Sequence, residues 1–355
     1  MTLPFPVSDA GADAVRIVRL ERGDDDALWD AYVGPRTQSL TDVAAWRDVV
    51  RDAYRISSHY FAARRGDTVV GALGLHEVRH PIFGHYLSTA IFSNDGGLYF
   101  DTSDARDALV AEARRLTEQT GASYLVIRTR QGALDGFRSD SHYRASVLDL
   151  HGGADAVWKA LPAKTRNQVR RGQREGFTLS RGTDQLDAFF AVFHAHMRDL
   201  GSPAHSRRFY EAIAKHLGDR ADFLVLRDGT ELVAGAVLFR MNDTAMNFHT
   251  VARRQFNRRC PNYLLYWTMI EDACMQGCTS FDMGRSRVDS SNLDFKSKWN
   301  PTEVTLHYNF HLRTAKQLPD LDPRNPSFRL LIAMWQKLPL FVTRRLGPRL
   351  ISGLA

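Results

Sequence analysis

The sequence has no long hydrophobic run, and this shortage limits where the protein can act. No apolar segment approaches the roughly 20 residues that a helix needs to cross a bilayer. The opening stretch, MTLPFPVSDAGADAV, lacks both the basic start and the apolar core of a secretory signal. We therefore expect a cytoplasmic protein that either stays in solution or lies peripherally at the inner face of the membrane.

Cysteine is also scarce. The chain has three cysteines, Cys260, Cys274 and Cys278, which is an odd number without a CxxC pair. Such a set favours buried, reduced thiols over disulfides or a zinc site.

One motif that would suggest zinc, HExxH, is present at residues 76–80. Zinc proteases need both histidines of this motif on one face of a helix. The alternation of residues 69–75 and the proline that follows the motif predict a strand instead, in which the histidines would lie about 13 Å apart. His194 and His196, two positions apart on a predicted helix, point to different faces. We therefore expect no metal site.

Acidic residues do not balance the basic ones: the 355-residue chain has a formal net charge of +7 and a pI near 9.4. This charge favours anionic partners such as phosphates, RNA or a lipid surface, without choosing between them. The length suggests about two domains, and 44% apolar residues can build real cores.

The order hairpin, helix, strand occurs twice along the chain. The first copy consists of residues 60–78, 103–119 and 124–127, and the second of 222–240, 263–275 and 280–283. This repetition predicts two copies of one α/β unit. We assign residues 1–150 to the first domain, 151–315 to the second, and 316–355 to a basic C-terminal tail that packs on the body.

Between the two copies, residues 163–175 predict a helix that follows a proline and ends before Gly176. Its five cations are Lys164, Arg166, Arg170, Arg171 and Arg174. Glu175 is the sole acid in this stretch. The repulsion between the cations destabilises the helix unless they bind an anion. We therefore favour a phosphate site over a plain surface helix. Gly172 inside this helix indicates close approach of another segment.

The densest set of polar and aromatic residues lies at 279–300, TSFDMGRSRVDSSNLDFKSKWN. Residues 279–283 predict a buried strand that contains Asp282, and we expect Gly284 to turn the chain into a loop that carries residues 285–287. Ligand sites in α/β proteins gather at such carboxyl ends of strands. A glycine turn with solvated charges is the alternative.

Three motifs resemble, in this order, the signature of FemAB-related transferases: PNYLLYW at 261–267, FDMGRS at 281–286 and FKSKW at 295–299. The similarity is greatest to the branch associated with PEP-CTERM/exosortase exopolysaccharide loci. The resemblance implies an α/β fold of two tandem GNAT-like domains, the acyl-CoA N-acyltransferase type, with a cleft between them. We expect each domain to have its own sheet, with its hairpin and the strand after its helix.

The resemblance also implies acyl or aminoacyl transfer, to nitrogen or oxygen, on a precursor of the cell envelope or of exopolysaccharide. The implied donor is aminoacyl-tRNA or acyl-CoA, used as a cosubstrate, with no permanently bound cofactor. The implied partners are a phosphorylated saccharide or lipid-linked precursor, and tRNA. Two alternatives stay open: a CoA-dependent GNAT N-acyltransferase, and a non-catalytic module that binds anionic lipid or polysaccharide.

Within the resembling motifs, we expect Lys296 to stabilise negative charge on the carbonyl oxygen of the donor, and Asp282 to orient the nucleophile or accept its proton. The alternative for Asp282 is a structural pair with Arg285. The candidates for substrate binding are Lys164, Arg166, Arg170, Arg171, Arg285, Ser286, Asn262, Tyr266, Phe295 and Trp299.

The glycine-rich turn with which GNAT domains hold the pyrophosphate of CoA has no good counterpart. The second copy has RRCPN at residues 258–262, without glycine and with a proline that lacks an amide donor. The first copy has an acidic stretch, DTSD, at residues 101–104. We therefore expect no ordinary CoA binding at either helix start.

The C-terminal tail, residues 328–350, alternates apolar residues with arginines. Its prolines at positions 339 and 348 argue against one long helix. The tail either packs on the body or lies on a lipid interface.

Overall fold

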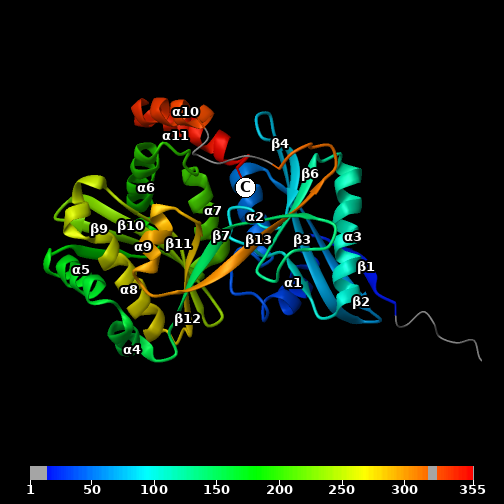
Figure 1. The fold of residues 1–355 in the computed structure, drawn as a ribbon, viewed down its shortest axis with the longest axis horizontal. Helices are drawn as coiled ribbons and strands as arrows, with labels where there is room; N and C mark the ends of the chain where they lie inside the picture. The colour runs from blue at the N-terminus through cyan, green and yellow to red at the C-terminus, as the bar shows by residue number, and fades with distance from the viewer. Residues whose placement is uncertain (1–13, 319–325, 355) are drawn as a thin grey trace, which may run out of the picture.

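A single sheet of thirteen strands runs through the part of the chain that the structure, a computed structural model, describes: residues 14–318 and 326–354. Two α/β halves lie side by side, and β7 and β13 run between them (Figure 1). The apolar and basic pattern predicted for the tail begins at residue 328, whose backbone is described but whose side chain lies outside the described residues.

The elements follow the predicted order. Those of the first half are β1 (Arg16–Leu20), α1 (Asp26–Val33), α2 (Ala45–Tyr54), β2 (Ser57–Arg65), β3 (Thr68–His80), β4 (Gly84–Ser88), β5 (Leu98–Phe100), α3 (Ser103–Thr120), β6 (Tyr124–Thr129) and β7 (Arg138–Asp149). Those of the second half are α4 (Gly153–Ala160), α5 (Ala163–Arg174), β8 (Thr178–Arg181), α6 (Leu186–Leu200), α7 (Arg207–Leu217), β9 (Ala221–Asp228), β10 (Glu231–Met241), β11 (Thr244–Ala252), α8 (Pro261–Met275), β12 (Ser280–Arg287), α9 (Ser291–Ser297) and β13 (Thr302–Leu312). The tail forms α10 (Pro326–Lys337) and α11 (Leu340–Ile351).

The predicted internal duplication is confirmed. The series β2, β3, β4, α3, β6, β7 corresponds to β9, β10, β11, α8, β12, β13. In each series the third strand pairs in parallel with the strand that follows the helix, β4 with β6 and β11 with β12, whereas the first and second strands pair antiparallel. Two short parallel pairs in matching places are the mark of one α/β unit built twice.

The last strands of the two series are exchanged. β7 of the first series pairs with β12 of the second, β13 of the second pairs with β6 of the first, and β7 and β13 pair with each other. Because each copy completes the other, the two copies share one continuous sheet, and the expectation of a separate sheet for each was wrong. The division at residue 150 stays a prediction.

The same exchange corrects the expected loop after Gly284. β12 continues to Arg287, because β7 offers it hydrogen-bonding partners: Arg285 lies opposite Ala145 and Arg287 opposite Tyr143. The pairing is irregular between Asp282 and Arg285, where Gly284 has φ +79°, a conformation that glycine adopts without strain.

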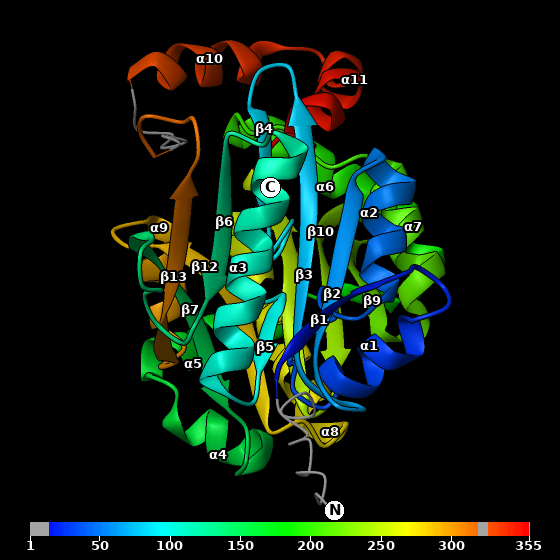
Figure 2. The same ribbon diagram turned by 90° about the vertical axis from the view of Figure 1, so that its right-hand side faces the viewer.

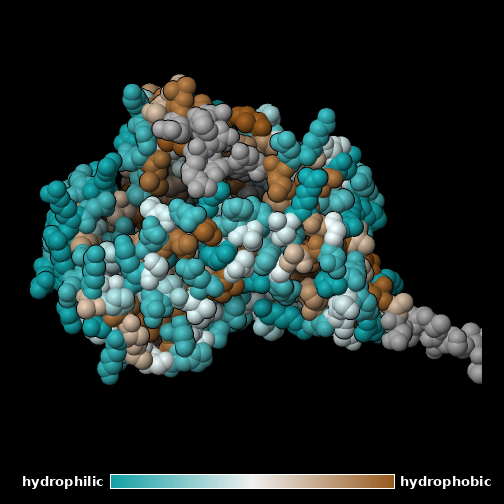
Figure 3. Space-filling view, viewed as in Figure 1, coloured by the Kyte–Doolittle hydropathy of each residue, from teal (hydrophilic) through white to brown (hydrophobic). Residues whose placement is uncertain are grey.

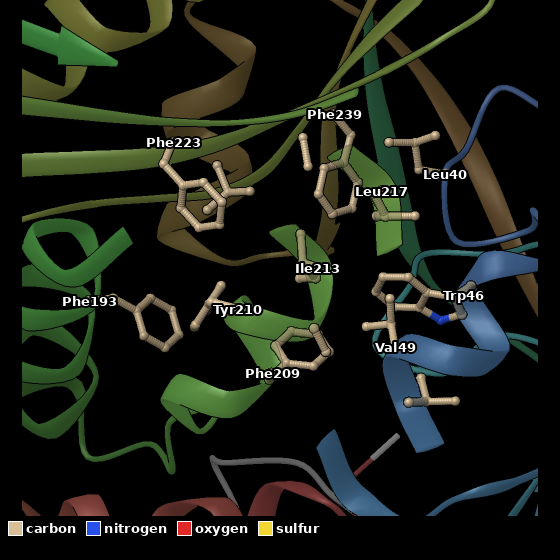
Figure 4. Packing of buried hydrophobic residues seen from close by; sticks show 14 of the residues in the cluster. Leu40, Trp46, Val49, Phe193, Phe209, Tyr210, Ile213, Leu217, Phe223 and Phe239 are labelled. Atoms are coloured by element: carbon tan, nitrogen blue, oxygen red, sulfur yellow. The ribbon is translucent and has the colours of Figure 1, made fainter. Parts of the chain in front are cut away.

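The largest apolar core joins the two halves. Figure 4 shows Trp46 and Val49 of α2 facing Phe209 of α7, under Phe239 of β10. The rings of Trp46 and Phe209 meet edge to face with centroids 6.0 Å apart. Burying side chains of this size stabilises by about 1.5–3 kcal/mol each, so this core fixes how the halves sit.

The tail helices lie together at one end of the molecule (Figure 2). α10 and α11 contact α6, and the end of α11 reaches the turn between β3 and β4. There the carbonyl oxygen of Arg349 lies 2.7 Å from His80 Nε2, and Tyr86 Oη donates to the carbonyl of Gly353 at 3.0 Å. Pro339 separates the two helices, as expected, whereas Pro348 is accommodated inside α11.

Candidate active site

Two neighbouring cavities lie where the parallel strand pairs diverge. β11 and β12 pair only over residues 244–246 and 280–282, and the first cavity, about 330 Å³, lies beyond that point between β11, β12, α8 and α9. The second cavity, about 190 Å³, lies at the matching place beyond β4 and β6. Both cavities touch Ser93, Asn94 and Met246, so they are adjacent.

Lys296 lies on the wall of the first cavity. The hydroxyl of Ser290 begins α9 by accepting the N–H of Leu293, and one turn later the side chain of Lys296 is buried, with 3% exposed. Its Nζ donates to the carbonyls of Gly284 at 2.7 Å and Arg285 at 3.0 Å, which uses two of its three N–H groups. Burial lowers the pKa of Lys296 to about 8, against the opposing attraction of Asp282.

Two predicted aromatic binding residues, Phe295 and Trp299, line neither cavity. Their rings pack against Tyr263 and Tyr266 of α8, with centroids 5.2 to 5.9 Å apart. They anchor α9 and thereby hold Lys296 in place. Tyr266 does line the first cavity, where its oxygen accepts a hydrogen bond from Asn247 Nδ2 at 2.8 Å.

Asp282 lines the second cavity and is already fully engaged. Its Oδ2 accepts from Arg130 at 2.8 Å and its Oδ1 accepts from the N–H of Gly284 at 2.7 Å. Arg130 also donates to Asp95 at 2.9 Å, so one guanidinium bridges two carboxylates. The alternative pair of Asp282 with Arg285 was therefore wrong, because Arg130 from the other copy takes that place.

Arg285 lies on the wall of the first cavity. Its guanidinium carbon sits 5.3 Å from the ring centroid of Tyr143 and 5.9 Å from that of Tyr308, and it donates to the hydroxyl of Tyr308. Ser286 and Asn262 line neither cavity. Within the described residues, Ser286 Oγ and Asn262 Oδ1 are buried and have no hydrogen-bonding partner.

The basic helix α5 lies apart from both cavities. Arg166 donates to the carbonyls of Leu161 at 2.8 Å and Lys159 at 3.1 Å, so it caps the end of α4. Arg170 sits 5.3 Å from the ring centroid of Trp158, while Lys164 and Arg171 are exposed. The predicted phosphate-binding residues thus form a surface of their own, separate from Lys296.

Helix α5 also covers the start of α8. A Cβ added to Gly172 would meet the carbonyl oxygen of Cys260 and Leu264 Cβ at 3.0 Å, which confirms the predicted close approach. Cys260 Sγ lies 2.7 Å from Gln168 Oε1. The start of α8 is therefore occupied by protein where a GNAT domain would cradle the pyrophosphate of CoA, and it does not fit that group.

Of the residues that line the second cavity, the sequence predicted only Asp282 as a site residue and missed, among others, Asp42, Asp95 and Arg130. Burial raises the pKa of Asp42 to about 7, although Tyr99 Oη and Thr37 Oγ1 donate to its Oδ2 at 2.6 and 3.0 Å. The duplication held a signal for Arg130, because it directly follows β6, the counterpart of the strand β12 that contains the motif at 281–286. Asp42 had no such signal.

Two histidines line the first cavity as neutral rings. Burial lowers the pKa of His249 to about 3 and that of His205 well below its usual value. The HExxH residues lie on β3, as predicted, where Ser58 Oγ lies 2.8 Å from His76 Nδ1. The described parts of the chain contain no group of three side chains able to hold a metal ion, and all three cysteines are free.

The duplicated unit and its splayed parallel strands define a tandem GNAT fold, and comparisons with known proteins agree. The family model for the acetyltransferase (GNAT) domain matches residues 163–297, well under half of the chain. A structure titled "Crystal structure of FemX" superposes with a TM-score of 0.64 at 14% identity, covering 89% of this chain and 100% of that one.

Two further structures share this fold. L-PGS from Bacillus licheniformis gives a TM-score of 0.55 at 13% identity, covering 89% of this chain and 98% of that one. A tandem GNAT protein from the clavulanic acid biosynthesis pathway gives 0.53 at 14% identity, covering 86% and 100%. At such identities the likeness establishes the fold alone. A comparison with curated protein sequences finds no match.

Proposed function

We propose that this protein is an acyl- or aminoacyl-transferase that modifies a precursor of the cell envelope or of exopolysaccharide. The observation that carries the proposal is the buried ammonium of Lys296, held by two carbonyls on the wall of a polar cavity at the splay of β11 and β12. This lysine lies inside the region that matches the acetyltransferase domain model. The PEP-CTERM-associated branch rests on the sequence motifs alone.

In the proposed reaction, the amine or hydroxyl of the acceptor attacks the carbonyl carbon of an ester or thioester donor. A new C–N or C–O bond forms, the donor's C–O or C–S bond breaks, and the nucleophile's proton passes to the leaving group. Negative charge develops on the carbonyl oxygen, and the third N–H of Lys296, whose side chain is only 3% exposed, stabilises it.

The proton passes through a carboxylate next to the site. Both oxygens of Asp282 accept hydrogen bonds from Arg130 and Gly284, which suits it to positioning. Asp42 lines the adjacent second cavity together with Asp282, and burial raises its pKa to about 7. We assign it as the proton acceptor for a nucleophile that enters from that cavity, because a general base works best when its pKa lies near the working pH.

The covered start of α8 favours an aminoacyl-tRNA donor over acyl-CoA. Gly172 and Gln168 of α5 contact Cys260, where the CoA pyrophosphate would have to bind. The exposed cations of α5 offer a surface for the phosphates of tRNA or of a phosphorylated or lipid-linked saccharide. With such a donor, the transfer would take place on the cytoplasmic side.

A transfer assay with purified protein tests the proposal. Charged tRNA and acyl-CoA are supplied in parallel as donors, with a lipid-linked saccharide fraction as acceptor. We expect transfer from charged tRNA that is lost in Lys296→Met. If the protein used acyl-CoA and not charged tRNA, the donor would be acyl-CoA. If it used neither donor, the proposed transferase activity would be wrong.

A further inference from the structure

Large hydrophobic side chains are exposed mainly at one end of the molecule. Of the nine in the described residues, five lie on the tail helices: Leu330, Leu331, Met334, Phe341 and Leu346. Figure 3 shows hydrophobic residues gathered over α10 and α11 at the upper edge of this face. Monomeric proteins rarely expose such a cluster unless it binds something.

Two more of the nine adjoin the same helices. Leu200 precedes Gly201, where an added Cβ would lie against Ile332 of α10, and Ile82 precedes Phe83, which lies against Gly353 after α11. Ile82 is 68% exposed. The exposed apolar residues therefore come from three separate segments that meet at this end, which we call the tail face.

The charge of the tail helices themselves has one sign, and the acid beside them, Asp199 before Leu200, pairs with Arg198 at 2.7 Å. Residues 326–354 contain five lysines or arginines and no acid. Lys337, Arg344, Arg345 and Arg349 are exposed, and none of them forms an ion pair with an acid in residues 14–318 or 326–354. Apolar side chains beside uncompensated cations are the composition of a helix that lies in a membrane interface.

The tail helices present these residues outward because their inner sides are packed. Ile332 lies against Gly201, and Gly347 lies against the backbone of Ala204. Leu330, Leu331 and Met334 are spaced one and four positions apart, so they share one outer side of α10. No helix in the described residues is long and apolar enough to span a bilayer, so the contact would be a surface contact.

We propose that the tail face binds the surface of an anionic lipid bilayer. A nucleic acid would use the cations but not the exposed leucines and Phe341. A second copy of this chain would bring the same cations against one another across a twofold contact, with no acid on the tail helices to meet them. Anionic lipid satisfies both features, since headgroups pair with cations and acyl chains receive the apolar residues.

The tail face is tied to the first cavity. Ile351 and Leu354, at the end of the same segment, form part of the cavity wall. Binding at the tail face therefore brings that cavity close to the lipid surface. Lipid binding itself does not depend on the proposed function, whereas the consequence that the acceptor is lipid-linked rests on it.

Vesicle sedimentation with the full chain tests the binding. We expect the protein to bind phosphatidylglycerol-containing vesicles at least about tenfold more tightly than pure phosphatidylcholine vesicles, with binding weakened by salt. Leu330→Ser/Leu331→Ser/Met334→Ser should reduce binding at least about tenfold. Arg344→Gln/Arg345→Gln should reduce it by about fivefold for each cation removed.

Matched variants elsewhere on the surface distinguish binding through the tail face from non-specific hydrophobic or electrostatic binding. Met275→Ser removes an exposed apolar residue on α8, and Lys164→Gln/Arg174→Gln removes two exposed cations of α5. These controls should keep vesicle binding, and thermal midpoints should show that every variant is folded. The proposal would be overturned if the protein bound neutral vesicles equally well, or if the control variants lost as much binding as the tail variants. It would also be overturned if the protein did not bind vesicles but bound RNA through Arg344 and Arg345.

Discussion

Lys296 Nζ donates a hydrogen bond to the backbone carbonyl of Gly284, 2.7 Å away, and so joins the short helix α9 to the irregular point of β12. Gly284 has φ +79°, and a Cβ there would lie 3.4 Å from the carbonyl of Asn247, which also lines the first cavity. The irregularity turns two carbonyls toward the lysine. The ammonium is thus held in place before any substrate binds, which is what stabilisation of transition-state charge requires.

The first prediction concerns Lys296 itself. Lys296→Met should lower the transfer rate by roughly 10²–10³, because a cation at the developing oxyanion is lost. Its effect on substrate affinity should be small, since the interaction strengthens in the transition state. The measurement is kcat and KM on the same preparation whose thermal midpoint is recorded.

Lys298 is the matched control. It caps α9, and its side chain is exposed and lines neither cavity. Lys298→Met should leave both rate and thermal midpoint unchanged. Equal rate losses at the two lysines would mean diffuse positive charge rather than one positioned ammonium.

The second prediction is a pH dependence in which activity and stability move in opposite directions. Burial lowers the pKa of Lys296 to about 8 from an ordinary 10.5, so its charge, and with it the transfer rate, should be lost as the pH rises through about 8. Between about 8 and 10.5 the unfolded chain binds more protons at this residue than the folded one. The free energy of unfolding should therefore rise with pH there.

Comparison with Lys296→Met isolates this effect from other groups that titrate at high pH. The difference in thermal midpoint between the parent protein and Lys296→Met should change in favour of the parent as the pH rises from 8 to 10. A difference that stays flat would show that the lysine's pKa is not lowered.

The third prediction concerns Asp42. Asp42→Asn keeps an oxygen that can accept from Tyr99 and Thr37 but removes the proton acceptor, so transfer should fall by roughly 10²–10⁴. In the parent protein the rate should rise with pH through about 7, as the carboxyl group ionises.

The pH dependence of the stability of Asp42→Asn tests whether the pKa of Asp42 is raised in the folded protein. A raised pKa means that the folded protein binds the proton more tightly, so the parent should lose stability relative to Asp42→Asn as the pH rises from about 4 to 7. Asp42→Ala, which also removes the acceptor for Tyr99 and Thr37, should be less stable than Asp42→Asn at every pH.

Local pattern was enough to predict much of the fold. The helices at 103–120 and 261–275, the strand nature of HExxH and the close approach at Gly172 all follow from residues near one another in sequence. The repeated order of hairpin, helix and strand predicted two copies of one unit, and the family motifs implied the tandem GNAT-like arrangement.

What could not be predicted depends on contacts between distant residues. The exchange of β7 and β13 extends β12 through Arg285, whereas local sequence alone indicates a loop after glycine. The partner of Asp282 is Arg130, 152 positions away. Asp42 owes its raised pKa to burial by segments far along the chain, and no motif marks it.

The last prediction separates two kinds of arginine on α5. Arg166 donates to the carbonyls of Leu161 and Lys159, whereas Arg174 is exposed and Arg170 stacks on Trp158 at the surface. Arg166→Gln should cost about 1–2 kcal/mol of stability, because the carbonyls at the end of α4 lose a charged donor.

Arg170→Gln/Arg174→Gln should instead leave the thermal midpoint unchanged and weaken binding of charged tRNA, with a flatter dependence of affinity on salt, since fewer phosphates are neutralised. The measurements are melting curves and a salt titration of tRNA binding for the parent protein, Arg166→Gln and the double variant. If Arg166→Gln weakened binding without loss of stability, the cap would not be its role. If the double variant bound tRNA as tightly as the parent at every salt concentration, α5 would be an ordinary solvated surface, and the phosphates of the substrate would have to be held elsewhere.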